Sequence, residues 1–174
     1  MSHNPLPPPD SHYVSAAEGW LMLKNPKEAS AELDHVAEEN RLHPEVLQAR
    51  WHIQSAVGDW EGAIITAQLC IDVDSGSSFG WIHRSYSLHE LKRTQEAWNN
   101  LEPATKLFPA EPIIAYNMAC YACQLGHMEI AKSWLRKAFK LGVPAVIKKM
   151  ALSDPDLTPL LPEIEELEDP EKPL

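Results

Sequence analysis

Four alanines recur along this chain at a constant spacing of 34 residues, and that spacing limits the possible folds more than any other feature. They are Ala29, Ala63, Ala97 and Ala131. Apolar residues follow each alanine four and seven positions later, as Leu101 and Ala104 follow Ala97. These offsets keep one face of a helix apolar. A fixed period of this length indicates a helical unit repeated about four times.

A second apolar-periodic segment of about a dozen residues precedes each alanine, as helical periodicity requires. Turn-forming residues separate the two segments of each unit, beginning with Asn25-Pro26, where Asn caps a helix and Pro takes its first position. Strand-like alternation is not sustained anywhere, so we predict an all-α fold of helix–turn–helix units. The predicted first helices span 12–23, 44–57, 78–91 and 112–125, and the second helices 26–41, 60–73, 94–107 and 128–140.

The third and fourth units carry residues typical of a known repeat. Trp81, Ser85, Ala97 and Pro109 fall at the third unit's signature positions, and the fourth contains YNMACYACQLG ahead of Ala131. With the 34-residue period, these residues make the chain resemble the tetratricopeptide repeat (TPR) family over about residues 10–143. The segment WIHRSYSLHELKRTQEA is similar to small bacterial members. Three positions depart from the family pattern: Arg41, Trp51 and Ser75.

The resemblance implies a right-handed superhelical array of about four units, closed by a C-terminal capping helix. We therefore divide the chain into a proline-rich extended start at 1–10, an array with its cap at 11–152, and an acidic, proline-containing segment at 153–174. Within this last segment we expect a short helix over 158–167 and a solvated tail over 163–171. Pro103 predicts a break in the helix 94–107 near Asn99 to Leu101.

Family geometry assigns part of each first helix to a concave groove. The groove positions include Glu18, Leu21 and Met22 in the first unit, Ser55 in the second and Glu90 in the third. The predicted peptide-binding residues are Gln48, His52, Phe79, Ile82, His83, Tyr86, His89, Tyr116, Asn117, Cys120, Cys123 and Gln124. Aromatic and histidine side chains provide rigid contact surface with polar tips. The function we predict is a protein-interaction adaptor that binds a peptide or protein segment there.

Charge restricts the partner. The net charge of −10 disfavours nucleic acid and anionic membranes, because both require a dense basic surface. The mapped groove contains no Lys or Arg, which disfavours an acidic C-terminal tail. Three cysteines, an odd number, in a chain of 174 residues indicate a reducing cytoplasm.

Two alternatives remain open. The first is a structural module that self-associates or docks through its convex side and ends. The second is a metal or redox protein that uses Cys120 and Cys123, which share a helix face, with His89 in the neighbouring row. Buried cysteines in helices usually just pack, so we expect no metal and no cofactor. Arg50 and Arg84 occupy equivalent repeat positions and are candidates for a structural ion pair or for contact with a ligand anion.

Two short segments match parts of enzyme motifs but lack the neighbouring element or residue that each motif requires. Gly76 to Gly80 fits G-x-S-x-G, but a helix rather than a strand precedes it, and a nucleophile elbow needs the strand. His89-Glu90 begins a zincin motif, yet Arg93 stands where the second histidine belongs. We therefore predict that the chain is not an enzyme.

Overall fold

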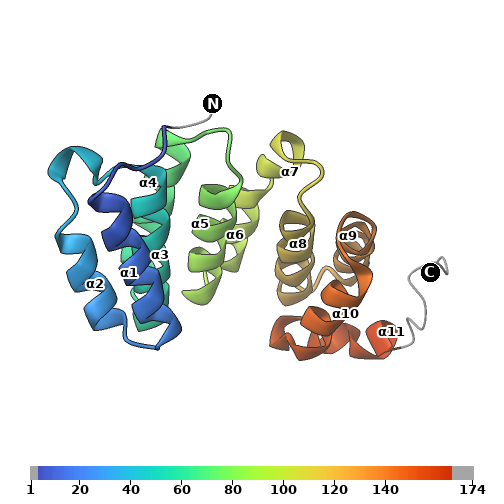
Figure 1. Ribbon diagram of the computed structural model, residues 1–174. Helices are drawn as coiled ribbons and strands as arrows, with labels where there is room; N and C mark the ends of the chain where they lie inside the picture. Colours follow the sequence, from blue (N-terminus) through green and yellow to red (C-terminus); the bar gives the residue numbers. More distant parts are fainter. Residues whose placement is uncertain (1–3, 166–174) are drawn as a thin grey trace. The chain divides into compact units, whose positions relative to one another are not determined.

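The structure is a computed structural model that describes residues 4–165 (Figure 1). Within that range it consists of helices and connecting loops, with no β-strand. The chain divides into two compact units, Met1–Leu91 (unit 1) and Lys92–Leu174 (unit 2). Each unit is an array of antiparallel helices in the order that the repeat predicts, so the all-α prediction is confirmed.

The described residues of unit 1, 4–91, form five α-helices. They are α1 (Asp10–Met22), α2 (Pro26–Asp34), α3 (Pro44–Val57), α4 (Trp60–Val73) and α5 (Phe79–Glu90). Helix α1 packs on α2 and α3, and α4 packs between α3 and α5. Figure 1 shows α1 and α3 side by side. A short 3-10 helix, η1 (Glu38–Asn40), lies between α2 and α3.

Unit 2 begins with a second helix of the repeat and ends with the C-terminal segment. Its elements are α6 (Thr94–Leu101), α7 (Ala104–Leu107), α8 (Pro112–Gln124), α9 (Met128–Leu141), α10 (Pro144–Ser153), the 3-10 helix η2 (Pro155–Leu160) and α11 (Leu161–Glu165). Helix α8 packs on α6, α9 and η2. The C-terminal capping helix expected at the end of the array corresponds to α10.

Helix starts follow the local sequence. The Asn25 side chain accepts a hydrogen bond from the Glu28 backbone N–H (3.4 Å), and Pro26 occupies the first turn. Asp59 caps α4 by accepting from the Gly62 N–H (3.1 Å). Proline also stands in the first turn of α3, α8 and α10. These residues satisfy or remove backbone donors that a helix N-terminus leaves free.

The turns between the two helices of a unit share one backbone feature. Four of the residues in the range 4–165 have positive φ: Lys24 (57°), Gly58 (73°), Lys92 (63°) and Gly126 (80°). They are spaced 34 residues apart, so the repeat extends to the left-handed residue that ends each first helix. Glycine adopts this conformation without strain, whereas lysine does not.

The repeated alanines lie in the core. Ala29, Ala63, Ala97 and Ala131 have no exposed surface. Ala63 belongs to α4, which packs on α3, and Ala131 belongs to α9, which packs on α8. A methyl side chain at such a position lets two helices approach closely.

Pro103 interrupts a helix as predicted. Helix α6 ends at Leu101 and α7 begins at Ala104. Proline supplies no N–H for the hydrogen bond to the preceding turn, and its ring crowds that turn. The predicted break is therefore confirmed.

The second helix of the first unit is shorter than predicted. It ends at Asp34 rather than near residue 41. The cause is Asp10, a carboxylate only 3 % exposed, which accepts hydrogen bonds from the Ala37 N–H (3.3 Å) and from Asn40 Nδ2 (2.7 Å). These bonds stabilise η1 in place of further α-helix.

Both terminal segments are more closely packed than the sequence suggested. Leu6, in the start expected to be extended, is 4 % exposed and belongs to the core cluster of α1–α3. At the other end, the side chains of Leu157, Leu160 and Ile164 are at most 2 % exposed. The short helix expected over 158–167 corresponds to the end of η2 followed by α11. Of the solvated tail expected over 163–171, the structure describes Glu163 and Glu165, which are exposed, and Ile164, which is buried. The rest of the tail, from residue 166, lies outside the described residues.

Candidate functional site

Helices α3 and α5 bring several predicted groove residues together in unit 1. We call Gln48, His52, Phe79, His83 and Tyr86 the α3–α5 face. The Phe79 and His83 rings stack with centroids 3.8 Å apart and planes 23° apart. The His52 ring meets both of them edge-on, at 5.8 Å from Phe79 and 5.9 Å from His83. Such arrangements are favourable for aromatic pairs, so the rings stabilise one another without a ligand.

Trp51 supports this face from beneath. It is 5 % exposed, packs with Ala63 and Ala67 of α4, and its Nε1 donates a hydrogen bond to Ser87 Oγ (3.1 Å). Its ring contacts that of His83 edge-on, with centroids 4.2 Å apart. The small residue that the repeat usually has here is replaced by an indole, which fixes the position of the rings above it.

Trp60, the first residue of α4, extends the aromatic cluster to Tyr86, with ring centroids 5.8 Å apart. Motif comparison did not identify Trp51 or Trp60 as site residues. The available signal was the presence of a large side chain at a position that normally holds a small one.

Gly80 permits the close approach of α5 to α4. A Cβ at this position would lie 2.7 Å from the Ala67 carbonyl oxygen and 2.8 Å from the Ile71 backbone N. No side chain fits there without moving backbone. The glycine therefore determines where the first turn of α5, with Phe79, meets α4.

The predicted residues differ in how far solvent reaches them. His52 is exposed, and Tyr86 is 38 % exposed. Gln48, Phe79, Ile82 and His83 are half-buried. His89 is only 5 % exposed, so solvent hardly reaches it. The α3–α5 face thus presents partly exposed rings on a fixed base.

Both histidines of the face are neutral at neutral pH. Burial lowers the pKa of His83 to about 4, despite the opposing effect of its hydrogen bond to the Phe79 carbonyl. In this bond Nδ1 donates to the Phe79 oxygen at 2.8 Å. Burial also lowers the pKa of His52, and the nearby Glu18 carboxylate partly opposes the shift. The face therefore carries no positive charge of its own.

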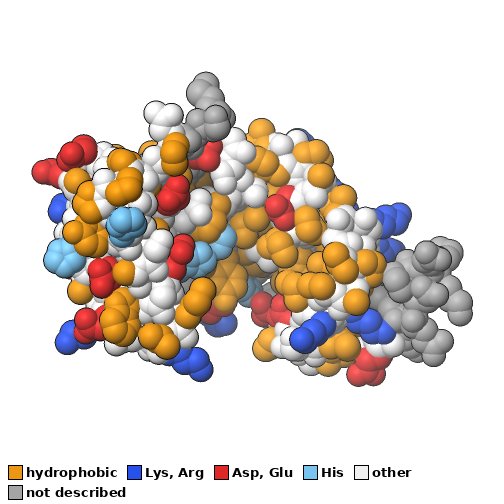
Figure 2. Space-filling model, in the orientation of Figure 1, with side chains coloured by type: hydrophobic (Ala, Val, Ile, Leu, Met, Phe, Trp, Pro, Cys, Tyr) orange, Lys and Arg blue, Asp and Glu red, His pale blue; other side chains and the backbone are white. Residues whose placement is uncertain are grey.

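Acidic side chains accompany the histidines. Figure 2 shows histidines among hydrophobic and acidic side chains on the face drawn.

Arg50 and Arg84 belong to α3 and α5, but each precedes a residue of the α3–α5 face by two positions, which places it on another side of its helix. Neither arginine makes an ion pair within residues 4–165, and the Nε of Arg84 is buried without a hydrogen-bond partner.

Three of the predicted groove residues of unit 2 contact the chain's own C-terminal segment. The Tyr116 hydroxyl donates to Asp154 Oδ2 (2.8 Å), and the Cys120 thiol contacts the same oxygen at 3.5 Å. Gln124 Nε2 donates to the Asp156 carbonyl (3.0 Å). Asn117 is half-buried and Cys123 is buried. The face of α8 that carries Tyr116 and Cys120 is thus already occupied by the start of η2.

The cysteines have the surroundings of packed thiols. Burial and the nearby Asp154 carboxylate raise the pKa of Cys120, and burial with Asp156 raises that of Cys123. Both shifts disfavour the thiolate that binds metals or reacts. Among residues 4–165, no group of three or more His, Cys, Asp or Glu side chains is arranged to bind a metal ion.

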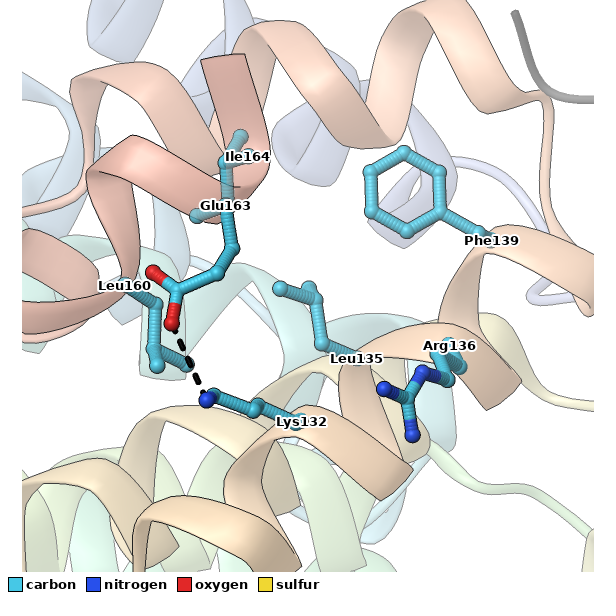
Figure 3. A pocket seen from close by; sticks show the side chains of 7 residues that line it. All are labelled: Lys132, Leu135, Arg136, Phe139, Leu160, Glu163 and Ile164. Carbon is cyan, nitrogen blue, oxygen red and sulfur yellow. Dashed lines mark ion pairs between the residues drawn. The ribbon is translucent and has the colours of Figure 1, made fainter. Parts of the chain in front are cut away.

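A small pocket of about 110 Å³ lies in unit 2 between α9 and the η2–α11 segment. Leu135, Phe139, Leu160 and Ile164 line it with Lys132, Arg136 and Glu163. Figure 3 shows Glu163 and Lys132 at one side, joined by an ion pair of 3.0 Å. This pair and the apolar contacts attach the C-terminal segment to α9.

None of the helices within residues 4–165 is long and apolar enough to cross a membrane. No family model matches the chain, and no curated protein matches it either. Among solved structures, it is similar to TTC0263, a thermophilic TPR protein of Thermus thermophilus. The two are 16 % identical, the alignment covers 92 % of this chain and 86 % of the other, and the TM-score is 0.73. This similarity establishes that the chain has a TPR-like fold.

Proposed function

We propose that this TPR-like chain is a non-catalytic protein-interaction module that binds a segment of a partner protein on the α3–α5 face. The fold supports an interaction role in general, because stacked helical repeats form extended binding surfaces. The observation that carries the specific proposal is the cluster of partly exposed rings held in place by buried Trp51.

Binding on this face should carry a low free-energy cost of ordering and desolvating side chains. The rings of Phe79, His83 and Tyr86 contact one another or Trp51, so a partner would restrict few additional rotamers on contact. Neutral histidines and a phenol lose less solvation free energy on burial than charged side chains do. Gln48 adds an amide that can pair with the backbone of a bound segment.

Helix α8 lies outside the proposed contact surface in the described state. Tyr116 and Cys120 already bind Asp154, and Gln124 binds the Asp156 carbonyl. A partner could reach buried Tyr116 and Cys120 only after η2 had separated from α8, whereas Gln124 is exposed. Buried Cys123 stays a candidate only in that opened state, whereas half-buried Asn117 stays a candidate in either state.

We assign the chain no catalytic role, nucleic-acid partner or membrane partner, and we place it in the cytoplasm of a bacterial cell. The acidic composition supports the choice of a protein partner, and the raised thiol pKa values fit cysteines that stay reduced.

Self-association through the ends of helices is the second candidate. Met22 and Leu23 at the end of α1 are 85 % and 72 % exposed, and Val57 at the end of α3 is 59 % exposed. Apolar side chains exposed to this degree can pair with a second copy. A mass that rises with protein concentration in sedimentation, and falls again for Met22→Ser, would favour this candidate.

The direct test is affinity capture with matched variants. Full-length protein would serve as bait in the wild-type form, as Tyr86→Ala and as Ile65→Ala. Ile65 is a suitable control because it is 65 % exposed on α4 of the same unit. Tyr86→Ala should lose the partner while its circular dichroism spectrum stays unchanged, and Ile65→Ala should retain it. If Ile65→Ala alone loses the partner, the binding surface lies elsewhere.

A further inference from the structure

Unit 1 carries most of the chain's negative charge. Its residues 1–91 include thirteen Asp and Glu against five Lys and Arg, a net charge of −8 with His neutral, out of −10 for the whole chain. A surface in this unit therefore attracts cations at long range more strongly than the average surface of the protein does.

Carboxylates also border the α3–α5 face itself. Glu18 of α1 lies close enough to His52 to affect the pKa of that imidazole. Glu45 stands three and seven positions before Gln48 and His52, on one side of α3, and Glu90 stands four positions after Tyr86 on α5. Residues at these spacings share a helix face.

These carboxylates are not neutralised within unit 1. None of Glu18, Glu45 and Glu90 forms an ion pair with another residue in the range 4–165. On the sides of α1, α3 and α5 that carry these carboxylates there is no Lys or Arg. The two histidines of the face, His52 and His83, are neutral. The rim is thus negative around an aromatic centre.

We infer that the occupant of the α3–α5 face is a basic segment of a partner protein, with Lys or Arg side chains flanking apolar or aromatic ones. This inference rests on the proposed function and specifies its partner. The apolar side chains contact Phe79 and the edge of Tyr86, and the cations approach Glu18 and Glu45. A cation can also lie over the faces of Tyr86 or Trp60.

Charge complementarity here acts mainly on specificity and association rate. Each exposed ion pair contributes little affinity, whereas an acidic segment would meet like charge at every carboxylate of the rim. The attraction is screened by salt, so the preference for a basic segment should weaken as ionic strength rises.

The test uses two fluorescent peptides with the same apolar residues, one with Lys and the other with Glu at the remaining positions. Anisotropy titrations with the full-length protein should show binding of the Lys peptide only. The double variant Glu18→Gln, Glu45→Gln should weaken that binding by about three- to tenfold at low salt. The matched control Glu38→Gln, Glu39→Gln changes net charge equally at two exposed residues of η1 and should have little effect.

Adding Tyr86→Ala separates failure of this inference from failure of the proposed function. Loss of binding on Tyr86→Ala with no effect of the Glu18/Glu45 pair would overturn the basic preference and leave the binding face intact. No effect of either change would overturn both proposals. Equal weakening by both double variants, equal binding of the Glu peptide, or no binding of the Lys peptide would each overturn the inference.

Discussion

At the scale of single residues, the four turns test how closely backbone and sequence agree. Gly58 and Gly126 occupy their left-handed positions without strain, whereas Lys24 and Lys92 adopt positive φ with a Cβ present. A left-handed conformation costs an L-residue roughly 1–2 kcal/mol. Replacing that residue with glycine removes this strain, but glycine loses more conformational entropy on folding, which offsets part of the gain.

We therefore predict that Lys92→Gly raises the free energy of unfolding by about 0.5–1 kcal/mol. The converse change, Gly126→Ala, should lower it by a similar amount, because φ is 80° and no neighbouring atom lies within 4 Å of the added Cβ. Urea unfolding followed by circular dichroism measures both. A destabilised Lys92→Gly would show that side-chain contacts of the lysine outweigh backbone strain.

The repeated alanines give a second prediction at this scale. Ala63→Leu should lower the free energy of unfolding by about 1–3 kcal/mol, because the site has no exposed surface and already packs against Trp51. Ala56 on α3 is exposed, so Ala56→Leu provides a control with the same change in volume. Equal melting temperatures for the two variants would contradict the assigned packing of α3 on α4.

At the scale of elements, His83 on helix α5 should make the free energy of unfolding depend on pH. The His83 pKa is about 4 in the folded chain and about 6.5 when unfolded, so the unfolded state binds a proton more readily. The contribution of neutral His83 to the free energy of unfolding is complete above about pH 7 and is lost as pH falls from 6.5 toward 4. The lowered pKa of His52 acts in the same direction.

Between pH 7 and 5 we predict a loss on the order of 1–2 kcal/mol in the free energy of unfolding from His83, allowing for its partial exposure. Urea titrations at both pH values measure it. His83→Phe should show a smaller loss, since the ring stack is kept and the titrating group is removed. An identical loss in the variant would assign the pH dependence to other groups.

The C-terminal segment provides a prediction about η2. Tyr116→Phe removes the hydroxyl that donates to Asp154. A hydrogen bond of this kind contributes about 0.5–1.5 kcal/mol, so amides of residues 154–164 should exchange with solvent faster by roughly two- to tenfold. Hydrogen-exchange mass spectrometry measures this. Tyr13→Phe, a control on α1, should leave the segment unchanged, and equal protection in both variants would contradict a role for Tyr116.

Most helices were predictable from sequence because the 34-residue period fixes their register. The turn residues and capping side chains Asn25 and Asp59 mark their starts, and Pro103 marks a break. The early end of α2 was not predictable, since it depends on Asp10, 27 residues from Ala37. Local periodicity carries no information about such a bond.

At the scale of the whole molecule, the same limit applies to the candidate site. Repeat positions identified which residues lie along the first helices, including His52, Phe79 and Tyr86. They did not reveal that Tyr116 is covered, because the covering residue, Asp154, lies 38 positions away outside the repeat. Burial of Leu157 and Leu160 stabilises that return of the chain. The sequence predicts a short helix over 158–167 but does not indicate which surface this helix covers.

Site-specific photo-crosslinking can detect a partner bound to unit 1 on the α3–α5 face. A photoreactive amino acid would replace exposed His52 in one full-length variant and exposed Ile65 of α4 in another, each irradiated in the source cells. A partner on this face should give a discrete cross-linked adduct from position 52 that is absent from position 65. An adduct from position 65 alone, or none from position 52 while the bait still captures its partner, would contradict it.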